Sequence, residues 1–266
     1  MYPFLHIGHF ALPTFGLMLA IAAVCACFLL QRNLRRYKLD ADAIGIIAIA
    51  TICGEVGAKL WHVLQDPAAL IAHPALLIDR TGLAWFGGLV GGIGALLWQA
   101  RSANLRSFTM LDLCAPSAAL GYGIGRIGCF TSGDGDYGIA SNLPWAMSFP
   151  NGIDPVNYPV HPTPLYECIA GIAIAAYLWR RSKPARAQLL HAGQITGEYL
   201  ILSGIARFLV EFIRINPRLY WGMSNAQAAS LGSIIAGIAL VLYARRHAIP
   251  SLTLAPATPQ VQEAVH

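Results

Sequence analysis

Residues 43–64 read AIGIIAIATICGEVGAKLWHVL, and this run decides the fold class of the chain. Its 22 residues include only two charged side chains, Glu55 and Lys59. An α-helix that crosses a bilayer needs about 20 predominantly apolar residues. The run is also continuous, whereas a strand of a membrane barrel alternates apolar and polar positions. The stretch therefore predicts a membrane-spanning helix.

Six further apolar segments lie on either side of this run. Hydrophobic residues make up 56% of the 266 residues and charged residues 12%, against about 25% charged residues in soluble domains. These proportions predict an all-α integral membrane protein in which residues 1–249 form one domain of seven transmembrane helices. The tail, 250–266, is expected to be disordered. The other six predicted spans are 10–31, 83–100, 108–130, 165–180, 194–213 and 226–244.

The positive charges fall mainly on one side of these spans. Of the 18 Lys and Arg residues, twelve follow the first, third, fifth and seventh spans, and three lie in the opposite connections. Cytoplasmic loops carry the excess of Lys and Arg in membrane proteins. The N-terminus is therefore expected outside and the C-terminus in the cytoplasm. The basic clusters then orient the chain and contact anionic lipid, so the net charge of +5 does not indicate nucleic-acid binding.

The longest predicted external connection is 131–164. It has no Lys or Arg and is rich in Gly, Pro, Asn and Asp, which are turn-forming residues. We expect it to form a small head outside the membrane. None of the six cysteines forms a CxxC pair, so they indicate buried apolar positions and no metal site.

Several charged residues lie inside the predicted spans. A charged side chain at the middle of a membrane helix costs at least about 2.5–3.5 kcal/mol, so it marks a functional site by default. Arg207 and Glu211 are four residues apart and share one helix face. Glu55 and Lys59 have the same spacing, and a self-neutralising pair that fixes helix packing is the favoured interpretation for them. Arg126 has no acidic residue near it in its span, and a guanidinium group binds phosphate in a bidentate manner.

Glycines are dense in the third and fourth predicted spans. Residues 123–128 match the GxGxxG pattern, but a dinucleotide site needs a preceding strand and a soluble helix. Glycines in membrane helices instead let a helix or a lipid approach the backbone closely. With Arg126 they suggest a cavity that admits an anionic lipid. The predicted lipid-binding residues are Arg126, Gly125, Gly128, Gly87 and Gly88.

The motifs and their order resemble the prolipoprotein diacylglyceryl transferases of bacteria over nearly the whole chain. The strongest match is Gly125-Arg126-Ile127-Gly128-Cys129-Phe130, followed by Gly133 and Tyr137-Gly138. The segment 161–167, HPTPLYE, matches a second family motif, and a third match places Arg207, Glu211 and Arg214 in the pattern GxxRFxxEFxR from Gly204. Any one of these motifs alone would be weak.

The resemblance implies an enzyme of the bacterial inner membrane. Such an enzyme moves the diacylglyceryl group of phosphatidylglycerol onto the thiol of the lipobox cysteine in the signal peptide of a prolipoprotein, forms a thioether and releases glycerol phosphate. No metal or dissociable cofactor is implied. Arg126 would hold the lipid phosphate, and Arg207 would stabilise the charge that develops on the leaving phosphate. Glu211 would orient Arg207 or bond a glycerol hydroxyl.

The chain departs from the family at four positions. It has Phe86 where a histidine is usual before the glycine pair, Phe15 and Ser203 where tyrosines are usual, and Cys129 where an asparagine is frequent. Phenylalanine can neither accept a proton nor bond a phosphate.

Three interpretations follow from these departures. The chain is a true transferase whose base comes from elsewhere, with Glu55, His62 and His161 as candidates. Alternatively, it catalyses a related lipid transfer to another acceptor. In the third interpretation it is a non-catalytic protein that binds or transports phospholipid.

Overall fold

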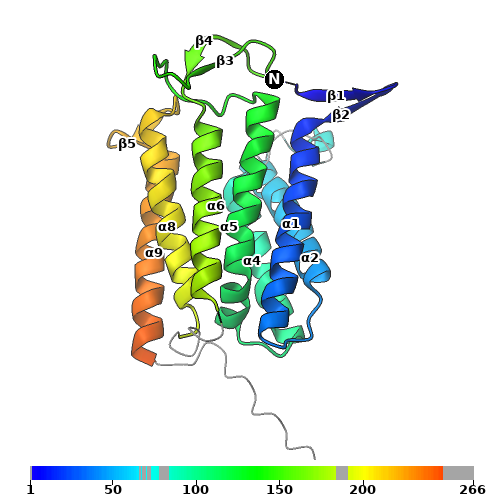
Figure 1. The fold of residues 1–266 in the computed structure, drawn as a ribbon, viewed down its shortest axis with the longest axis vertical. Coiled ribbons are helices and arrows are strands. Elements are labelled where there is room, and N and C mark those ends of the chain that lie inside the picture. Colours follow the sequence, from blue (N-terminus) through cyan, green and yellow to red (C-terminus); the bar gives the residue numbers. More distant parts are fainter. Residues whose placement is uncertain are drawn as a thin grey trace, which may run out of the picture.

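In the part of the chain that the structure describes, seven α-helices run alternately up and down in one bundle (Figure 1). The computed structural model describes residues 2–65, 67, 70, 73–77, 84–183 and 191–247, so the predicted tail, 250–266, lies outside the described residues. The helices are α1 Thr14–Arg36, α2 Ala43–Leu64, α4 Trp85–Ser102, α5 Ser107–Ser132, α6 Thr163–Arg181, α8 Gln194–Val210 and α9 Asn225–His247.

The helices follow the apolar segments of the sequence, with one clear exception at the N-terminus. The helix α2 coincides with the predicted span, and Asp42 caps it by accepting a hydrogen bond from Ile44 N at 3.0 Å. The predicted span 10–31 is wrong at both ends, because Phe4–Ile7 and Phe10–Pro13 pair as strands β1 and β2 before α1 begins. At the other end no helix breaker follows the apolar run, and α1 continues to Arg36.

Helix pairs pack closely where glycines face each other. The pair α2 and α4 is the clearest case, because the backbones of Gly57 and Gly87 meet there. A Cβ atom added at either glycine would overlap the carbonyl oxygen of the other. The helices α8 and α9 form a second close pair, and α5 packs between α1 and α6.

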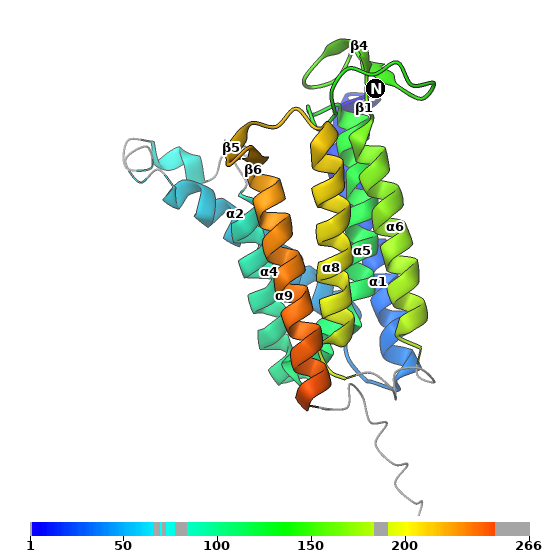
Figure 2. The same ribbon diagram turned by 90° about the vertical axis from the view of Figure 1, so that its left-hand side faces the viewer.

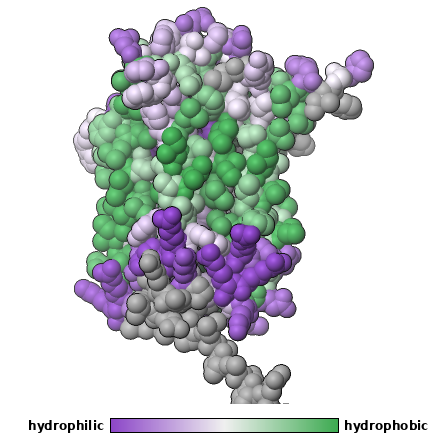
Figure 3. Space-filling model, in the orientation of Figure 1, coloured by the Kyte–Doolittle hydropathy of each residue, from purple (hydrophilic) through white to green (hydrophobic). Residues whose placement is uncertain are grey.

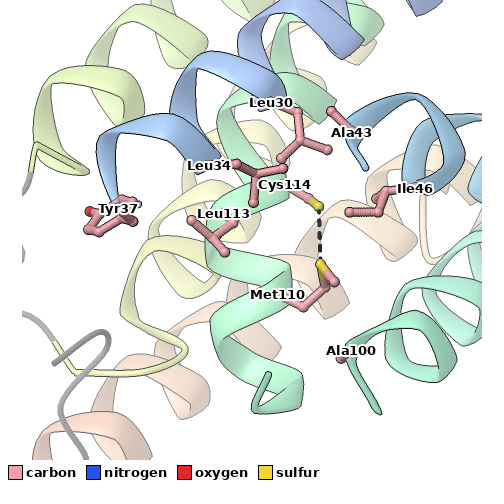
Figure 4. Close-up of a cluster of buried hydrophobic side chains, with 9 residues drawn as sticks. All are labelled: Leu30, Leu34, Tyr37, Ala43, Ile46, Ala100, Met110, Leu113 and Cys114. Atoms are coloured by element: carbon pink, nitrogen blue, oxygen red, sulfur yellow. Dashed lines mark hydrogen bonds between the residues drawn. The ribbon is translucent and has the colours of Figure 1, made fainter. Parts of the chain in front are cut away.

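The end of the bundle away from the strands β1 to β4 is closed by an apolar core from α1, α2, α4 and α5, drawn in Figure 4. Leu30 and Leu34 of α1 and Met110 of α5 are fully buried there. Polar groups also link elements near this end. Asp112 of α5 accepts hydrogen bonds from the backbone N–H groups of Gly193 and Thr196, at 2.7 and 2.8 Å, and so caps the start of α8.

The connection between α5 and α6 is a small folded head and not an irregular loop. Gly133 ends α5 in the left-handed conformation, with φ +60°. The strands β3 Met147–Phe149 and β4 Val156–Val160 pair antiparallel above the bundle (Figure 1). Phe149 is fully buried, and Tyr137 stacks on it with ring centroids 4.9 Å apart. The head is tied to the α8–α9 connection by the hydrogen bond from Ile139 N to Ile213 O, 2.8 Å long.

The α8–α9 connection holds the remaining short elements. A 3₁₀ turn, η2 Glu211–Ile213, continues α8, and the strands β5 Arg218–Tyr220 and β6 Met223–Ser224 pair before α9. A further 3₁₀ turn, η1 Pro74–Leu77, lies between α2 and α4.

On the face drawn in Figure 3, an apolar belt lies between two more polar ends. Among the described residues, three helices are long and apolar enough to cross a membrane by length and composition, namely α1, α2 and α9. The last turns of α1, α4, α6 and α9 carry basic residues, and these turns lie at the end opposite the head. The chain is therefore a mostly helical membrane protein.

Candidate active site

A cavity of about 620 Å³ lies inside the bundle below the head. Figure 2 draws α4 and α9 on one side and α5, α6 and α8 on the other, and the lining residues come from both groups. Apolar residues such as Leu89 and Ala119 form much of the wall. The charged lining residues are Arg126, Glu167, Arg207 and Glu211.

Glu167 is the centre of the charged cluster. It lies one turn into α6, and its side chain is only 2% exposed. Its Oε1 atom accepts hydrogen bonds from Arg207 Nη1 and from the Tyr122 hydroxyl, each at 2.6 Å. Its Oε2 atom lies 3.4 Å from Arg126 Nε and 3.5 Å from Arg214 Nη1. One carboxylate thus holds three guanidinium groups and one phenol together.

The head contributes a second carboxylate, Asp136, which forms ion pairs with both Arg126 and Arg214. Burial would raise the pKa of Asp136, but the positive charges of Arg214 and Arg126 outweigh that effect and lower it. Thr163 of α6 also donates a hydrogen bond to the backbone carbonyl of Asp136, at 2.5 Å. The position of the head is therefore linked directly to the position of two arginines.

Glu211 is the third carboxylate, and its side chain is fully buried. Its Oε2 atom lies 2.9 Å from Arg207 Nη2. Its Oε1 atom accepts hydrogen bonds from Asn216 Nδ2 at 2.6 Å and Ser224 Oγ at 2.7 Å. Glu211 therefore lies against one side of the Arg207 guanidinium through Oε2, while its Oε1 atom is held by two hydrogen bonds.

The charges of this cluster balance. Three arginines, Arg126, Arg207 and Arg214, face the three carboxylates of Asp136, Glu167 and Glu211. Buried ionised groups are tolerated when they are paired and hydrogen-bonded. An anionic ligand in the cavity would compete with the carboxylates for the guanidinium groups. The arrangement suits an anion that enters and leaves, such as a lipid phosphate.

The structure brings together the main predicted site residues but not the predicted glycines. Arg126, Arg207 and Glu211 line the same cavity, although they come from different helices or turns. Gly128 faces α1, where an added Cβ would lie 3.2 Å from Met18 Cβ and Phe15 Cδ2. Gly87 and Gly88 face α2, and an added Cβ at Gly125 would meet no atom within 4 Å. The lipid-binding role of these four glycines stays a prediction.

The three candidate bases lie elsewhere among the described residues. Glu55 and His62 are exposed on α2 and do not line the cavity. His161 lies in the head, where its Nδ1 atom is 3.2 Å from the Tyr166 hydroxyl. That hydroxyl accepts a hydrogen bond from Trp145 Nε1 at 2.7 Å. The geometry therefore gives these residues no contact with the arginine cluster.

Three of the four positions where the chain departs from the family motifs lie near the site, namely Phe86, Ser203 and Cys129. Phe86 and Ser203 both line the cavity. The Ser203 hydroxyl donates to Tyr199 O at 2.7 Å and so is turned back onto its own helix. Cys129 Sγ lies 3.7 Å from Arg126 Nη1.

Sequence reasoning did not nominate Tyr122, Asp136 or Glu167 for the site. Asp136 lies in a glycine-rich segment typical of turns, and only the folded head brings it to the arginines. Glu167 could have been predicted as a site residue, because it is an acidic residue at the start of an apolar span and Arg126 has no acidic partner within its own predicted span. Tyr122 precedes Arg126 by one helical turn, and Arg126 Cζ lies 5.0 Å from its ring centroid.

The fold and the site define a class, namely a helical membrane protein with an arginine-lined internal cavity. The sequence model described as prolipoprotein diacylglyceryl transferase matches residues 3–243. The chain therefore belongs to the prolipoprotein diacylglyceryl transferase family.

Curated relatives agree with this assignment over most of their length. A phosphatidylglycerol–prolipoprotein diacylglyceryl transferase of Pseudomonas fluorescens (strain Pf0-1) is 32% identical over an alignment of 268 positions, which covers 95% of this chain and 95% of the relative. The enzyme of the same name from Clostridium tetani is 34% identical over 228 residues, which cover 84% of this chain and 90% of the relative. Another from Pseudomonas aeruginosa (strain LESB58) is 32% identical and covers 91% of this chain.

Proposed function

We propose that this chain transfers the diacylglyceryl group of phosphatidylglycerol to the thiol of a lipobox cysteine in a prolipoprotein. The observation that carries the proposal is the joining of Arg126 and Arg207 at one cavity through Glu167. The relatives that bear the name of this activity cover nearly the whole chain. An apolar wall beside a guanidinium cluster suits a phospholipid, which has both acyl chains and a phosphate.

The part of the reaction that most needs stabilisation is the departure of the leaving group, glycerol phosphate. The thiol sulfur forms a bond to the terminal glyceryl carbon, and the bond from that carbon to the phosphate oxygen breaks. The phosphate then changes from a diester with one negative charge to a monoester with about two near neutral pH. Arg126 binds the diester, and Arg207 stabilises the charge that develops on departure, because preorganised cations act most strongly where charge appears.

Glu211 acts in this scheme by orienting Arg207. Its Oε2 atom contacts Arg207 Nη2 at 2.9 Å, while its Oε1 atom is occupied by Asn216 and Ser224. The Oε2 atom accepts no hydrogen bond within the described residues, but it is buried, so a glycerol hydroxyl has no open path to it. Of the two predicted roles for Glu211, the contacts support orientation.

In the membrane, we propose that all seven helices span the bacterial inner membrane, with the head outside and the C-terminus in the cytoplasm. The helices run side by side (Figure 1), the face drawn in Figure 3 carries an apolar belt, and the basic helix ends gather opposite the head. Labelling of single cysteines with an impermeant maleimide in intact cells tests this arrangement. A cysteine at Tyr158 in the head should react, whereas one at Arg246 should react only after lysis.

The activity itself is tested with purified protein in detergent, phosphatidylglycerol and a peptide that carries a lipobox cysteine. Mass spectrometry should detect the diacylglyceryl thioether with the wild type and none with Arg126→Ala or Arg207→Ala. Removal of a stabilising group at a developing oxyanion costs about 10²–10³-fold in rate. The absence of adduct from folded wild type, while a known transferase is active in parallel, would overturn the proposal.

A further inference from the structure

We propose that Tyr122 and Glu167 together accept the proton of the attacking thiol. In this scheme the thiol proton passes to the Tyr122 hydroxyl oxygen as the hydroxyl proton passes to Glu167 Oε1, 2.6 Å away. The sulfur forms its bond to the glyceryl carbon, and the carbon–oxygen bond to phosphate breaks. The inference rests on the proposed function and names the proton acceptor of that reaction.

The lining of the cavity leaves few groups that can accept a proton. No histidine lines it within the described part of the chain, and Phe86 offers no acceptor. The arginines are permanently protonated. The acidic and phenolic groups that remain are Glu167, Glu211, Tyr122 and Tyr199.

Glu211 and Tyr199 are poorly placed to act as the acceptor. The Glu211 side chain is fully buried, and Asn216 and Ser224 already donate to its Oε1 atom. Within the described residues the Tyr199 hydroxyl makes no hydrogen bond to a carboxylate, so this phenol has no group to which it could pass a proton. Glu167 is a carboxylate, but only 2% of its side chain is exposed.

Tyr122 supplies the missing connection between the cavity and Glu167. It is 38% exposed and lines the cavity, while its hydroxyl donates to the buried carboxylate. A phenol that donates and accepts at once can carry a proton to a carboxylate that the thiol cannot reach. The relay returns Tyr122 to its neutral form, so no phenolate is needed.

The charges around Glu167 couple this proton transfer to departure of the phosphate. Arg126, Arg207 and Arg214 face Glu167 from α5, α8 and the connection after η2, and Asp136 and Glu211 share these arginines. When a phosphate diester draws Arg126 and Arg207 away, Glu167 becomes a better proton acceptor. When Glu167 is protonated, the arginines that it held are free for the additional charge on the leaving phosphate. The total charge of the site stays constant through the step.

The test compares Tyr122→Phe with Tyr243→Phe. The first variant removes the hydroxyl but keeps the ring over Arg126. The second removes a phenol near the end of α9, where Tyr243 stacks on His247 far from the cavity. Both proteins are assayed for thioether formation from pH 6.5 to 9, with KM for phosphatidylglycerol and the thermal midpoint as further measurements.

We expect Tyr122→Phe to lower kcat by about 10²-fold at pH 7, with KM little changed, because acid–base catalysis contributes about 10²–10⁴-fold. Its rate should rise about tenfold per pH unit up to the thiol pKa of about 8.5, since only preformed thiolate then reacts. Tyr243→Phe should match the wild type, whose rate should rise much less with pH. An unchanged kcat in Tyr122→Phe, or a loss that is equal at every pH, would overturn the inference. An inactive wild type would instead count against the proposed function.

Discussion

A pair of glycines on α4 tests whether the glycine-rich helices serve packing or lipid binding. Gly87 is buried against α2, where an added Cβ would overlap the carbonyl oxygen of Gly57 and lie near Trp61. Gly94 lies on the same helix, but an added Cβ there would meet no atom within 4 Å. The substitutions Gly87→Ala and Gly94→Ala therefore add the same methyl group to one helix in opposite surroundings.

The two substitutions should change stability in opposite directions. Alanine is favoured over glycine inside a helix by about 0.8–1 kcal/mol, which is the gain expected at Gly94. At Gly87 the obstacle is a backbone carbonyl that cannot rotate away, and overpacking of this kind costs about 1–3 kcal/mol. Because both variants share the helix gain, it cancels in the comparison, and the two should differ by about 1–3 kcal/mol. For a protein of this size that difference is about 2–10 °C in thermal midpoint.

Thermal unfolding in one detergent, followed by tryptophan fluorescence, measures this difference. Gly87→Ala should unfold below the wild type and Gly94→Ala at or slightly above it. Binding of phosphatidylglycerol by the folded Gly87→Ala protein should be nearly unchanged if this glycine serves packing. A Gly87→Ala protein as stable as Gly94→Ala, but with impaired lipid binding, would refute the packing argument and support the lipid-binding role.

Two further predictions concern the carboxylates of the site. Glu211→Gln should lower kcat by about 10²-fold with a smaller change in KM, because a misplaced Arg207 no longer meets the leaving phosphate. Initial rates over a range of phosphatidylglycerol concentrations measure both constants. A changed KM with an unchanged kcat would contradict the prediction. The pKa of Asp136 is lower in the folded protein than its ordinary value of 3.8 in the unfolded chain. Its ion pairs therefore stabilise the fold fully above pH 3.8, and this stabilisation is lost as the pH falls through the lower pKa of the folded state. The thermal midpoint of the wild type should therefore fall more steeply than that of Asp136→Asn between pH 4 and pH 2, and parallel curves would exclude this carboxylate as the cause.

The sequence was sufficient to place the helices because their signal is local. The run 43–64 is apolar throughout and follows a capping aspartate, so α2 occupies the predicted residues. The strands β1 and β2 escaped prediction because Phe10–Pro13 are as apolar as the helix that follows. Only their pairing with Phe4–Ile7 distinguishes them, and hydropathy does not report pairing.

The candidate site was predictable in its cations but not in its anions. Arg126 and Arg207 stand out because a charge inside an apolar helix is costly and therefore conspicuous. Asp136 lies among turn residues where an acid is ordinary, and Glu167 lies at the start of α6, where the approach of α5 and α8 gives it its role. The role of the glycines could not be predicted either. A glycine such as Gly87 allows either a lipid or a helix to approach the backbone closely, and the sequence does not indicate which of the two is present.

The order of the ion pairs along the chain has a consequence for biosynthesis. A lone arginine at the centre of a helix opposes insertion by about 2.5–3.5 kcal/mol. Arg126 is made first, and its partner Asp136 follows it by 10 residues, before α6 brings Glu167. Arg207 is followed within one turn by Glu211. Arg126 and Arg207 thus each leave the ribosome shortly before a neutralising acid, and Arg214 follows acids already made, so the nascent chain does not have to hold an uncompensated arginine in the bilayer while the next helix is made.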